Sequence, residues 1–253
     1  MKLPLVDTYA FPVTVPSSNT SITIRPFLVK EEKLLLMAQQ SKSYDEQVEA
    51  IAQVIRNCTN NQVEPKTAPF FDIEYLLIQL RTRSVGETIS PYYVCRNKVN
   101  EEECGHRTAV TINLQEIKVT DFVTTIPVKS LQVSPRYVLN LRYPTVYTVQ
   151  RLLLFNASVD DAERSKLAVD VVDSLIDVFD TLEDKDTGTL YKFDDFNRTQ
   201  KIEFLNSLLS TDYEKITQFV AEMPTVYVET SYTCEKCAFE HSIRLQGMSD
   251  FLG

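Results

Sequence analysis

The N-terminal third of the chain carries a short β pattern followed by helical patterns. Apolar and polar residues alternate along residues 11–15 and 22–24, on either side of the turn-rich segment PSSNTS. Such alternation around a turn predicts a β-hairpin. Apolar positions then recur at helical spacing over residues 28–40, 43–58 and 70–84. We therefore expect a hairpin followed by three helices.

Two further hairpins are expected, one near the middle of the chain and one near its end. Residues 85–95 and 104–119 alternate as strands do, and they flank the charged loop RNKVNEEE. Residues 224–234 and 241–247 form a second pair of strands around the short turn EKC. Between the two hairpins, residues 120–145 are rich in β-branched residues and punctuated by turns.

The second half of the chain also returns to helical spacing. The pattern predicts a short helix over residues 146–158 and a long helix over residues 160–184. Two more helices are predicted over residues 194–210 and 211–223. Both halves thus run from strand to helices, then to a hairpin that carries cysteines.

This shared order predicts an internal duplication. The segment IRPFLVKEEKLLLMA matches LRYPTVYTVQRLLLFN, which aligns leucines 34–36 with leucines 152–154, and further on Cys95 aligns with Cys234. The alternative is chance similarity between two α+β segments. The predicted fold is α+β with two similar lobes, each made of helices and a β-hairpin.

The domain boundaries follow from the same comparison. Residues 1–118 form the expected N-terminal α+β lobe with the first cysteine hairpin. Residues 119–136 are a β-rich connector, and residues 137–253 form the C-terminal α+β lobe with the second cysteine hairpin.

Composition and charge exclude several classes of function. The chain has 253 residues, 43% of them hydrophobic and 24% charged, as in ordinary globular proteins. Its formal net charge of −9 disfavours binding to nucleic acid or to anionic lipid. No stretch approaches the ~20 apolar residues of a membrane span, so stable membrane insertion is not expected. The N-terminal segment lacks a secretory pattern, and we expect a reducing cytosol.

The five cysteines supply the strongest candidate chemistry. Cys95 and Cys104 flank one hairpin loop, and Cys234 and Cys237 flank the other. Two hairpins that each contribute two thiolates form a zinc ribbon, so we expect a structural zinc site that clasps the two lobes. The alternatives are a degenerate site that only packs, or independent buried thiols. Cys58 ends a helical face and is expected in the core.

Other functional sites have little support. The two histidines, His106 and His241, follow the cysteine pairs closely, and either is an alternative zinc ligand. The segment from Asp184 places Gly188 and Asp195 out of register for a calcium-binding EF-hand. The glycines are scattered singly, and paired aspartates such as 160–161 and 194–195 stand at expected helix starts. No catalytic residues are predicted.

Several motifs resemble a known family. The stretch SITIRPFLVKEEKLLLMAQQ, followed by FDIEYLLIQLRTRSVGE, is similar to the baseplate hub assembly proteins of T-even-like contractile-tailed bacteriophages. Leu3 and Pro4, Cys58 at a helix end, and the C-terminal CEKC leading towards Asp250 also match, so the likeness spans nearly the full length. One departure is Ala238, which stands where a knuckle glycine is expected.

The resemblance implies a role in building the phage tail. Its members are hub components or assembly factors that act through protein–protein contacts, with other baseplate hub proteins as partners. It implies assembly in the host cytoplasm and a place in the virion tail baseplate. The alternatives are an assembly chaperone absent from the mature virion and a thiol- or zinc-dependent hub-processing enzyme. The RPFLVKEEK block is either a docking surface or an ordinary helix with residues 34–37 in the core.

Overall fold

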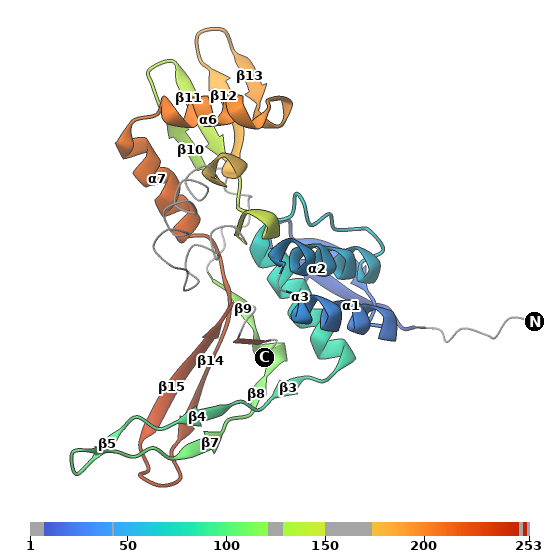
Figure 1. Cartoon of the computed structure of the whole chain (residues 1–253), viewed down its shortest axis with the longest axis vertical. Coiled ribbons are helices and arrows are strands. Elements are labelled where there is room, and N and C mark those ends of the chain that lie inside the picture. Colours follow the sequence, from blue (N-terminus) through green and yellow to red (C-terminus); the bar gives the residue numbers. More distant parts are fainter. Residues whose placement is uncertain (1–7, 42, 121–128, 150–173, 248–249, 252–253) are drawn as a thin grey trace, which may run out of the picture.

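The computed structural model describes residues 8–41, 43–120, 129–149, 174–247 and 250–251, and shows three regions (Figure 1). A helical body lies beside a long arm of paired strands, and a four-stranded sheet with two helices lies at the opposite end from the arm. Within these residues every strand pairing is antiparallel. Helices and strands occur together, which confirms the predicted mixture of α and β structure. No described helix has both the length and the apolar character needed to cross a membrane.

The helical body matches the sequence prediction. Its elements are β1 (Phe11–Val15), β2 (Thr20–Ile24), α1 (Val29–Gln40), α2 (Tyr44–Cys58) and α3 (Phe70–Ser84). The hairpin β1–β2 turns one face, including the fully buried Ile24, towards Ile55 of α2 and Leu76 of α3. Helix α2 begins after Ser43, whose hydroxyl accepts a hydrogen bond from the backbone N–H of Glu46.

The arm is built from two hairpins that are far apart in the sequence. The first hairpin is a series of short ladders: β3 (Thr88–Ile89) with β8 (Ile112–Asn113), β4 (Tyr92–Val94) with β7 (Arg107–Ala109), and β5 (Lys98–Val99) with β6 (Glu102–Glu103). The second pairs β14 (Val226–Thr233) with β15 (Glu240–Gln246). Both predicted cysteine hairpins are therefore present, and they lie side by side (Figure 1).

The base of the arm joins the two halves of the chain. The short helix η1 (Leu114–Glu116) leads into β9 (Lys118–Val119), which pairs with β14. A buried apolar cluster continues this contact into the helical body, with Ile78 of α3 against Val226 and Leu245 of the second hairpin. The C-terminal Phe251 is buried in the same cluster.

The four-stranded sheet has the order β10–β11–β12–β13 and belongs to the second half. Its strands are β10 (Lys129–Gln132), β11 (Tyr137–Leu141), β12 (Phe179–Asp184) and β13 (Thr189–Lys192). The short helices η2 (Leu175–Val178) and η3 (Phe193–Asp195) flank β12 and β13, and α6 (Arg198–Asn206) and α7 (Ser210–Ala221) follow. Phe179, Leu205 and Phe219 are buried in their common core.

One helix prediction is wrong in its last part. Residues 179–184 were expected to end a long helix but form β12, because β11 and β13 supply backbone partners on both of its edges. Leu182 faces Leu139 on one neighbour and Tyr191 on the other, so cross-strand packing overrides the helical spacing. Residues 146–149 are helical as expected, and residues 150–173 lie outside the described residues.

The expected duplication into two similar lobes is not confirmed. Within the described residues, the strands before β9 form only two-stranded sheets, whereas the second half builds a sheet of four. The leucines at 152–154 that suggested the repeat lie outside the described residues. The division at residues 118 and 136 stays a prediction.

Candidate metal centre

Cys95 and Cys104 lie side by side because the first hairpin is interrupted between two of its ladders. Cys95 follows β4, Cys104 precedes β7, and the residues between them fold into the β5–β6 tip. The backbone N–H of Cys95 donates to the carbonyl of His106 over 2.8 Å, and that of Cys104 donates to Asn97 over 2.8 Å. The long loop between the two cysteines is thus an ordered hairpin tip.

The second pair sits on a tight turn at the end of β14. The Cys234 N–H donates to the carbonyl of Phe239 over 2.9 Å, and the Ala238 N–H donates back to the carbonyl of Cys234 over 2.9 Å. Ala238 has φ of 55°, in the left-handed region that favours glycine. The departure noted in the sequence is therefore a strained alanine at a position whose conformation suits glycine.

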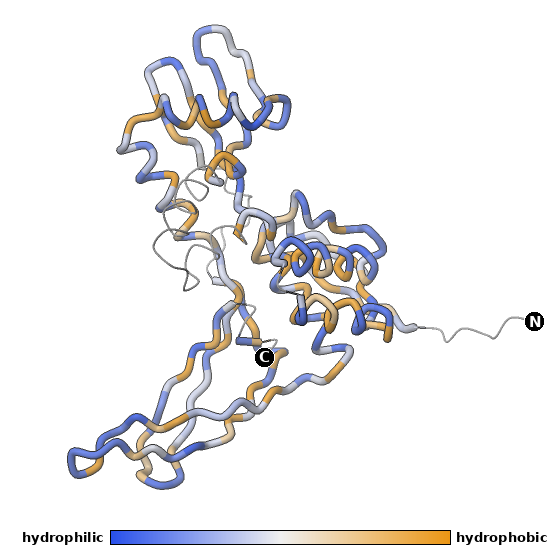
Figure 2. Tube along the Cα trace, in the orientation of Figure 1, coloured by the Kyte–Doolittle hydropathy of each residue, from blue (hydrophilic) through white to orange (hydrophobic). Residues whose placement is uncertain are grey.

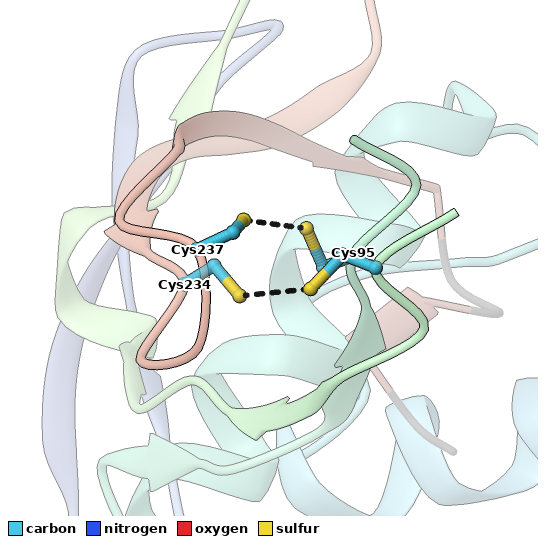
Figure 3. Close-up of side chains that lie close together, drawn as sticks. Cys95, Cys234 and Cys237 are labelled. Atoms are coloured by element: carbon cyan, nitrogen blue, oxygen red, sulfur yellow. Dashed lines mark hydrogen bonds between the residues drawn. The ribbon is translucent and has the colours of Figure 1, made fainter. Parts of the chain in front are cut away.

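The four sulfur atoms form one compact group. They all lie within 4.8 Å of one another, with 3.6 Å between Cys95 and Cys237 and 3.8 Å between Cys104 and Cys234. Figure 3 shows Cys95 facing Cys234 and Cys237 across the gap between the two hairpins. Four sulfurs at about 2.3 Å from a tetrahedral zinc ion stand about 3.8 Å apart, so the spacing fits that ion. The predicted meeting of these four cysteines is confirmed.

The thiols are shielded from water and free of disulfides. Cys95, Cys104 and Cys234 are buried, and Cys237 is half-buried. Burial raises the pKa of the Cys95 thiol to about 12, because the charged form loses its hydration. The backbone N–H of Phe239 lowers the pKa of Cys237 to about 6, because it donates to the thiolate. A buried set of four thiols is suited to a cation that stabilises them as thiolates.

Polar groups from both hairpins surround the sulfurs. Nε2 of His241 lies 3.1 Å from Sγ of Cys95, and Nδ2 of Asn97 donates to Sγ of Cys237 over 3.7 Å. Nζ of Lys236 on the second hairpin donates to the carbonyl of Cys104 on the first over 3.2 Å. These contacts cross between the hairpins and orient the sulfurs, as outer groups commonly do for the ligands of metal sites.

The histidines occupy different surroundings. The His241 ring stacks on Tyr232 with centroids 4.8 Å apart and meets the edge of Phe239, so its position is fixed beside Cys95. Nε2 of His106 lies 3.7 Å from Oε2 of Glu235. Within the described part of the chain, the compact group of metal-binding atoms consists of the four cysteines without either histidine. His241 was predicted as an alternative ligand and instead contacts the Cys95 sulfur, whereas Asn97 was not among the sequence candidates.

The remaining sequence candidates have structural roles. Cys58 is buried in the core of the helical body as expected, and burial raises the pKa of its thiol to about 11. Asp184 accepts a hydrogen bond from Nε of Arg136 over 2.8 Å, and this contact holds the pKa of its carboxyl below the usual range. The loop that does not fit the EF-hand spacing therefore uses its first aspartate, Asp184, in an ion pair with Arg136.

The aspartates at 194–195 do not start the helix that was predicted over residues 194–210. They lie in η3, and Asp194 accepts two hydrogen bonds from Arg142, at 2.9 and 3.0 Å. Helix α6 begins later, after Asn197, whose side chain accepts from the N–H of Gln200 over 3.0 Å. The pair at 160–161 lies outside the described residues.

The RPFLVKEEK block contains a buried ion pair. The guanidinium of Arg25 donates to both carboxylate oxygens of Glu31, at 2.9 and 3.2 Å, and the Leu28 N–H donates to the same carboxylate over 2.9 Å. The Glu31 side chain is fully buried. The block thus fixes the start of α1 against β2. Leu36 and Met37 are exposed, so the alternative that placed residues 34–37 in the core is wrong for these two.

Comparison with known proteins gives a family match. The family model described as T4 bacteriophage base plate protein matches residues 8–253, which is almost the whole chain. Neither the curated proteins nor the solved structures contain a significant match. The match covers the helical body, the four-stranded sheet and both cysteine hairpins. The chain therefore belongs to the T4 bacteriophage base plate protein family.

Proposed function

We propose that this chain is a non-enzymatic component or assembly factor of the baseplate hub, and that a zinc ion held by four cysteines stiffens its arm. The observation that carries the proposal is the meeting of four sulfurs from two hairpins that lie far apart in the chain. Membership of the baseplate family supplies the setting, the phage tail. Its partners are then other phage baseplate hub proteins.

The donor set suits a structural metal. Cys95, Cys104, Cys234 and Cys237 would hold the ion and fill all four tetrahedral positions. Catalytic zinc sites keep a position for water or substrate, whereas structural ones are closed. Zinc bound in this way contributes about 10–16 kcal/mol of binding free energy in small zinc domains, and this energy favours folding.

The arm has a physical need for such a clasp. Beyond the buried cluster at its base, the two hairpins meet at Tyr93 against Tyr232, with ring centroids 6.1 Å apart, and at the cysteine group with the polar contacts around it. A two-stranded hairpin is marginally stable in water by itself. The bound ion would join the distal parts of both hairpins, so the arm would present a fixed surface to other proteins.

The non-enzymatic part of the proposal rests on the side chains present. His241 is held by ring stacking beside a buried thiol. The carboxylates of Asp184 and Asp194 each accept hydrogen bonds from an arginine. These groups stabilise structure in the described residues. We propose that the chain acts in the host cytoplasm during assembly and then in the virion tail baseplate.

A phage that carries Cys95→Ser in this gene tests the proposal. Electron microscopy of infected cells should show loss of completed baseplates, while Cys58→Ala at the cysteine outside the cluster should retain them. Normal baseplates in the Cys95→Ser phage would contradict the proposed role. Mass spectrometry of wild-type virions distinguishes a resident component from a chaperone that leaves. A cleavage product missing from a variant that still folds would instead indicate a processing enzyme.

A further inference from the structure

His241 stands on the face of the second hairpin that is turned towards the first hairpin. Along β15, residues 241, 243 and 245 are buried or half-buried, whereas residues 240, 242, 244 and 246 are exposed. Since successive side chains of a strand point to opposite faces, His241 shares the inward face with Leu245, which packs in the cluster at the base of the arm. Within its own hairpin, His241 is paired with Tyr232 of β14.

Aromatic rings hold the imidazole of His241 in one orientation. The ring stacks on Tyr232 with an interplanar angle of 14°, and it meets the ring of Phe239 at 66°. Tyr232 in turn lies against Tyr93 of the first hairpin. This aromatic group lies towards the far end of the arm, which Figure 2 shows as mostly hydrophilic. A side chain fixed in this way loses little conformational freedom when it makes a further hydrogen bond.

The fixed ring directs one nitrogen at a sulfur of the other hairpin. Nε2 of His241 lies 3.1 Å from Sγ of Cys95, and 146 positions separate the two residues in the chain. A cysteine binds a metal as its thiolate, which carries no hydrogen and can only accept a hydrogen bond. When Cys95 holds a metal ion, the donor in this contact must therefore be Nε2 of His241.

The cysteine group needs such donors because of its charge. Four thiolates carry more negative charge than one zinc ion neutralises, and a charge removed from water is costly unless it is paired or hydrogen-bonded. The amide of Asn97 donates to the sulfur of Cys237 over 3.7 Å. Cys95 is fully buried, so solvent does not supply a hydrogen bond to its sulfur. The imidazole of His241 fills that need.

Building on the proposed zinc clasp, and dependent on it, we infer that His241 is a positioning residue of the metal site. Its Nε2–H donates to the zinc-bound sulfur of Cys95 and strengthens metal binding, and the imidazole does not itself bind the ion. In the described part of the chain, the compact group of candidate ligand atoms contains the four sulfurs and not this nitrogen. Because the imidazole and the sulfur belong to different hairpins, their hydrogen bond also ties the two hairpins together.

Two substitutions separate the hydrogen bond from the packing of the ring. His241→Phe keeps an aromatic ring for stacking and removes the N–H, whereas His241→Gln removes the ring and keeps an amide N–H. His106 gives the matched control, because it lies beside Cys104 and its Nε2 has no hydrogen-bond partner among the described residues. Circular dichroism of each full-length variant establishes that the fold is intact.

Competition with a chromophoric chelator measures the affinity of each full-length protein for Zn²⁺. We expect His241→Phe to bind zinc about 10- to 100-fold more weakly, as is typical for loss of a group that hydrogen-bonds to a metal ligand. His241→Gln should recover most of this loss, and His106→Phe should bind zinc like the wild type.

The absorption spectrum with Co²⁺ in place of zinc reports on the sulfur itself. The thiolate-to-cobalt bands should shift to lower energy in His241→Phe, because a sulfur that accepts no hydrogen bond is a stronger electron donor. Altered packing of the ring alone would not produce this shift. Nitrogen-15 NMR of the zinc-bound wild type needs no variant, and it should find a hydrogen on Nε2 of His241.

The outcomes separate failure of this role from failure of the zinc clasp. Equal zinc affinity in His241→Phe and the wild type would overturn the role of His241 and leave the four-cysteine site standing. Equal losses in His241→Phe and His241→Gln would overturn it as well, since the ring and not its N–H would then matter. An Nε2 without hydrogen in the zinc-bound chain would show an acceptor or a ligand instead. A wild type that binds no zinc would contradict both the role and the clasp.

Discussion

The sulfur atoms of Cys95 and Cys237 lie 3.6 Å apart, although 142 positions separate the two residues in the chain. This contact joins a hairpin near the middle of the sequence to one near its C-terminal end. The separation is too long for a disulfide bond and close to the edge of a tetrahedral zinc–thiolate site, about 3.8 Å.

Replacing one cysteine of the cluster should separate the distal parts of the two hairpins that form the arm. Cys95→Ser removes a fully buried sulfur, and we expect zinc content to fall and the melting temperature to drop, because metal binding and folding are coupled. Atomic absorption and differential scanning calorimetry measure the two effects. Cys58→Ala is the matched control and should keep its zinc, since Cys58 lies in the separate core of the helical body. Equal zinc content in Cys95→Ser and the wild type would rule out the four-cysteine site.

Ala238→Gly should stabilise the protein. Ala238 adopts φ of 55°, where a Cβ atom costs roughly 1–2 kcal/mol that glycine avoids. We expect the free energy of unfolding in urea to rise by roughly 0.5–1 kcal/mol, after the greater flexibility of glycine in the unfolded chain is allowed for. Ala50→Gly in helix α2 is the control and should destabilise by a similar amount. A destabilised Ala238→Gly would show that the strain is absent.

Glu31→Ala should be among the most damaging substitutions in the helical body. It removes the acceptor for Arg25 and for the Leu28 N–H, and it leaves a largely buried guanidinium without its charge partner. The expected loss in the free energy of unfolding is about 3 kcal/mol, typical for breaking one side of a buried ion pair. Urea denaturation measures it, with Glu32→Ala at the exposed neighbouring position as the control. Equal effects of the two substitutions would contradict the assigned role of Glu31.

Asp72 should make stability depend on pH. It accepts hydrogen bonds from Ser17, and burial raises the pKa of its carboxyl to about 6 from the ordinary 3.8. Because the folded state holds the proton more tightly, the contribution of Asp72 is fully present below pH 3.8 and is lost as pH rises through about 6. The full difference corresponds to about 3 kcal/mol.

Asp72→Asn tests this dependence because asparagine keeps an acceptor for the Ser17 N–H and carries no charge. Relative to the wild type, the variant should gain stability as the pH rises between 3.8 and about 6. Urea denaturation of both proteins across that range measures the difference. Parallel stability curves would show that Asp72 does not titrate in the way its burial implies.

The sequence predicts the helical body well because its signals are local. Val48, Ala52 and Ile55 recur on one face of α2, and Ser43 caps it, so the helix needs no distant information. The cysteine hairpins were also predictable, since strand alternation brackets each pair and zinc chemistry requires four ligands. These elements depend on spacing along the chain alone.

The parts that sequence did not reveal depend on distant contacts. Residues 179–184 fit a helical pattern, and only pairing with β11 and β13 makes them a strand. The contact of His241 with Cys95 requires the two hairpins to face each other in one particular register. Glu31 resembles any acidic residue in a first helical turn, and its burial follows from the position of Arg25 at the end of β2.

Native mass spectrometry of the purified full-length chain tests the central claim most directly. The account predicts a mass that exceeds the polypeptide by one zinc ion, and loss of that ion when the cysteines are alkylated after unfolding. It also predicts that Cys58→Ala retains the ion and Cys95→Ser does not. A folded wild-type chain without metal, purified from zinc-supplemented cells in the absence of chelators, would contradict the metal clasp.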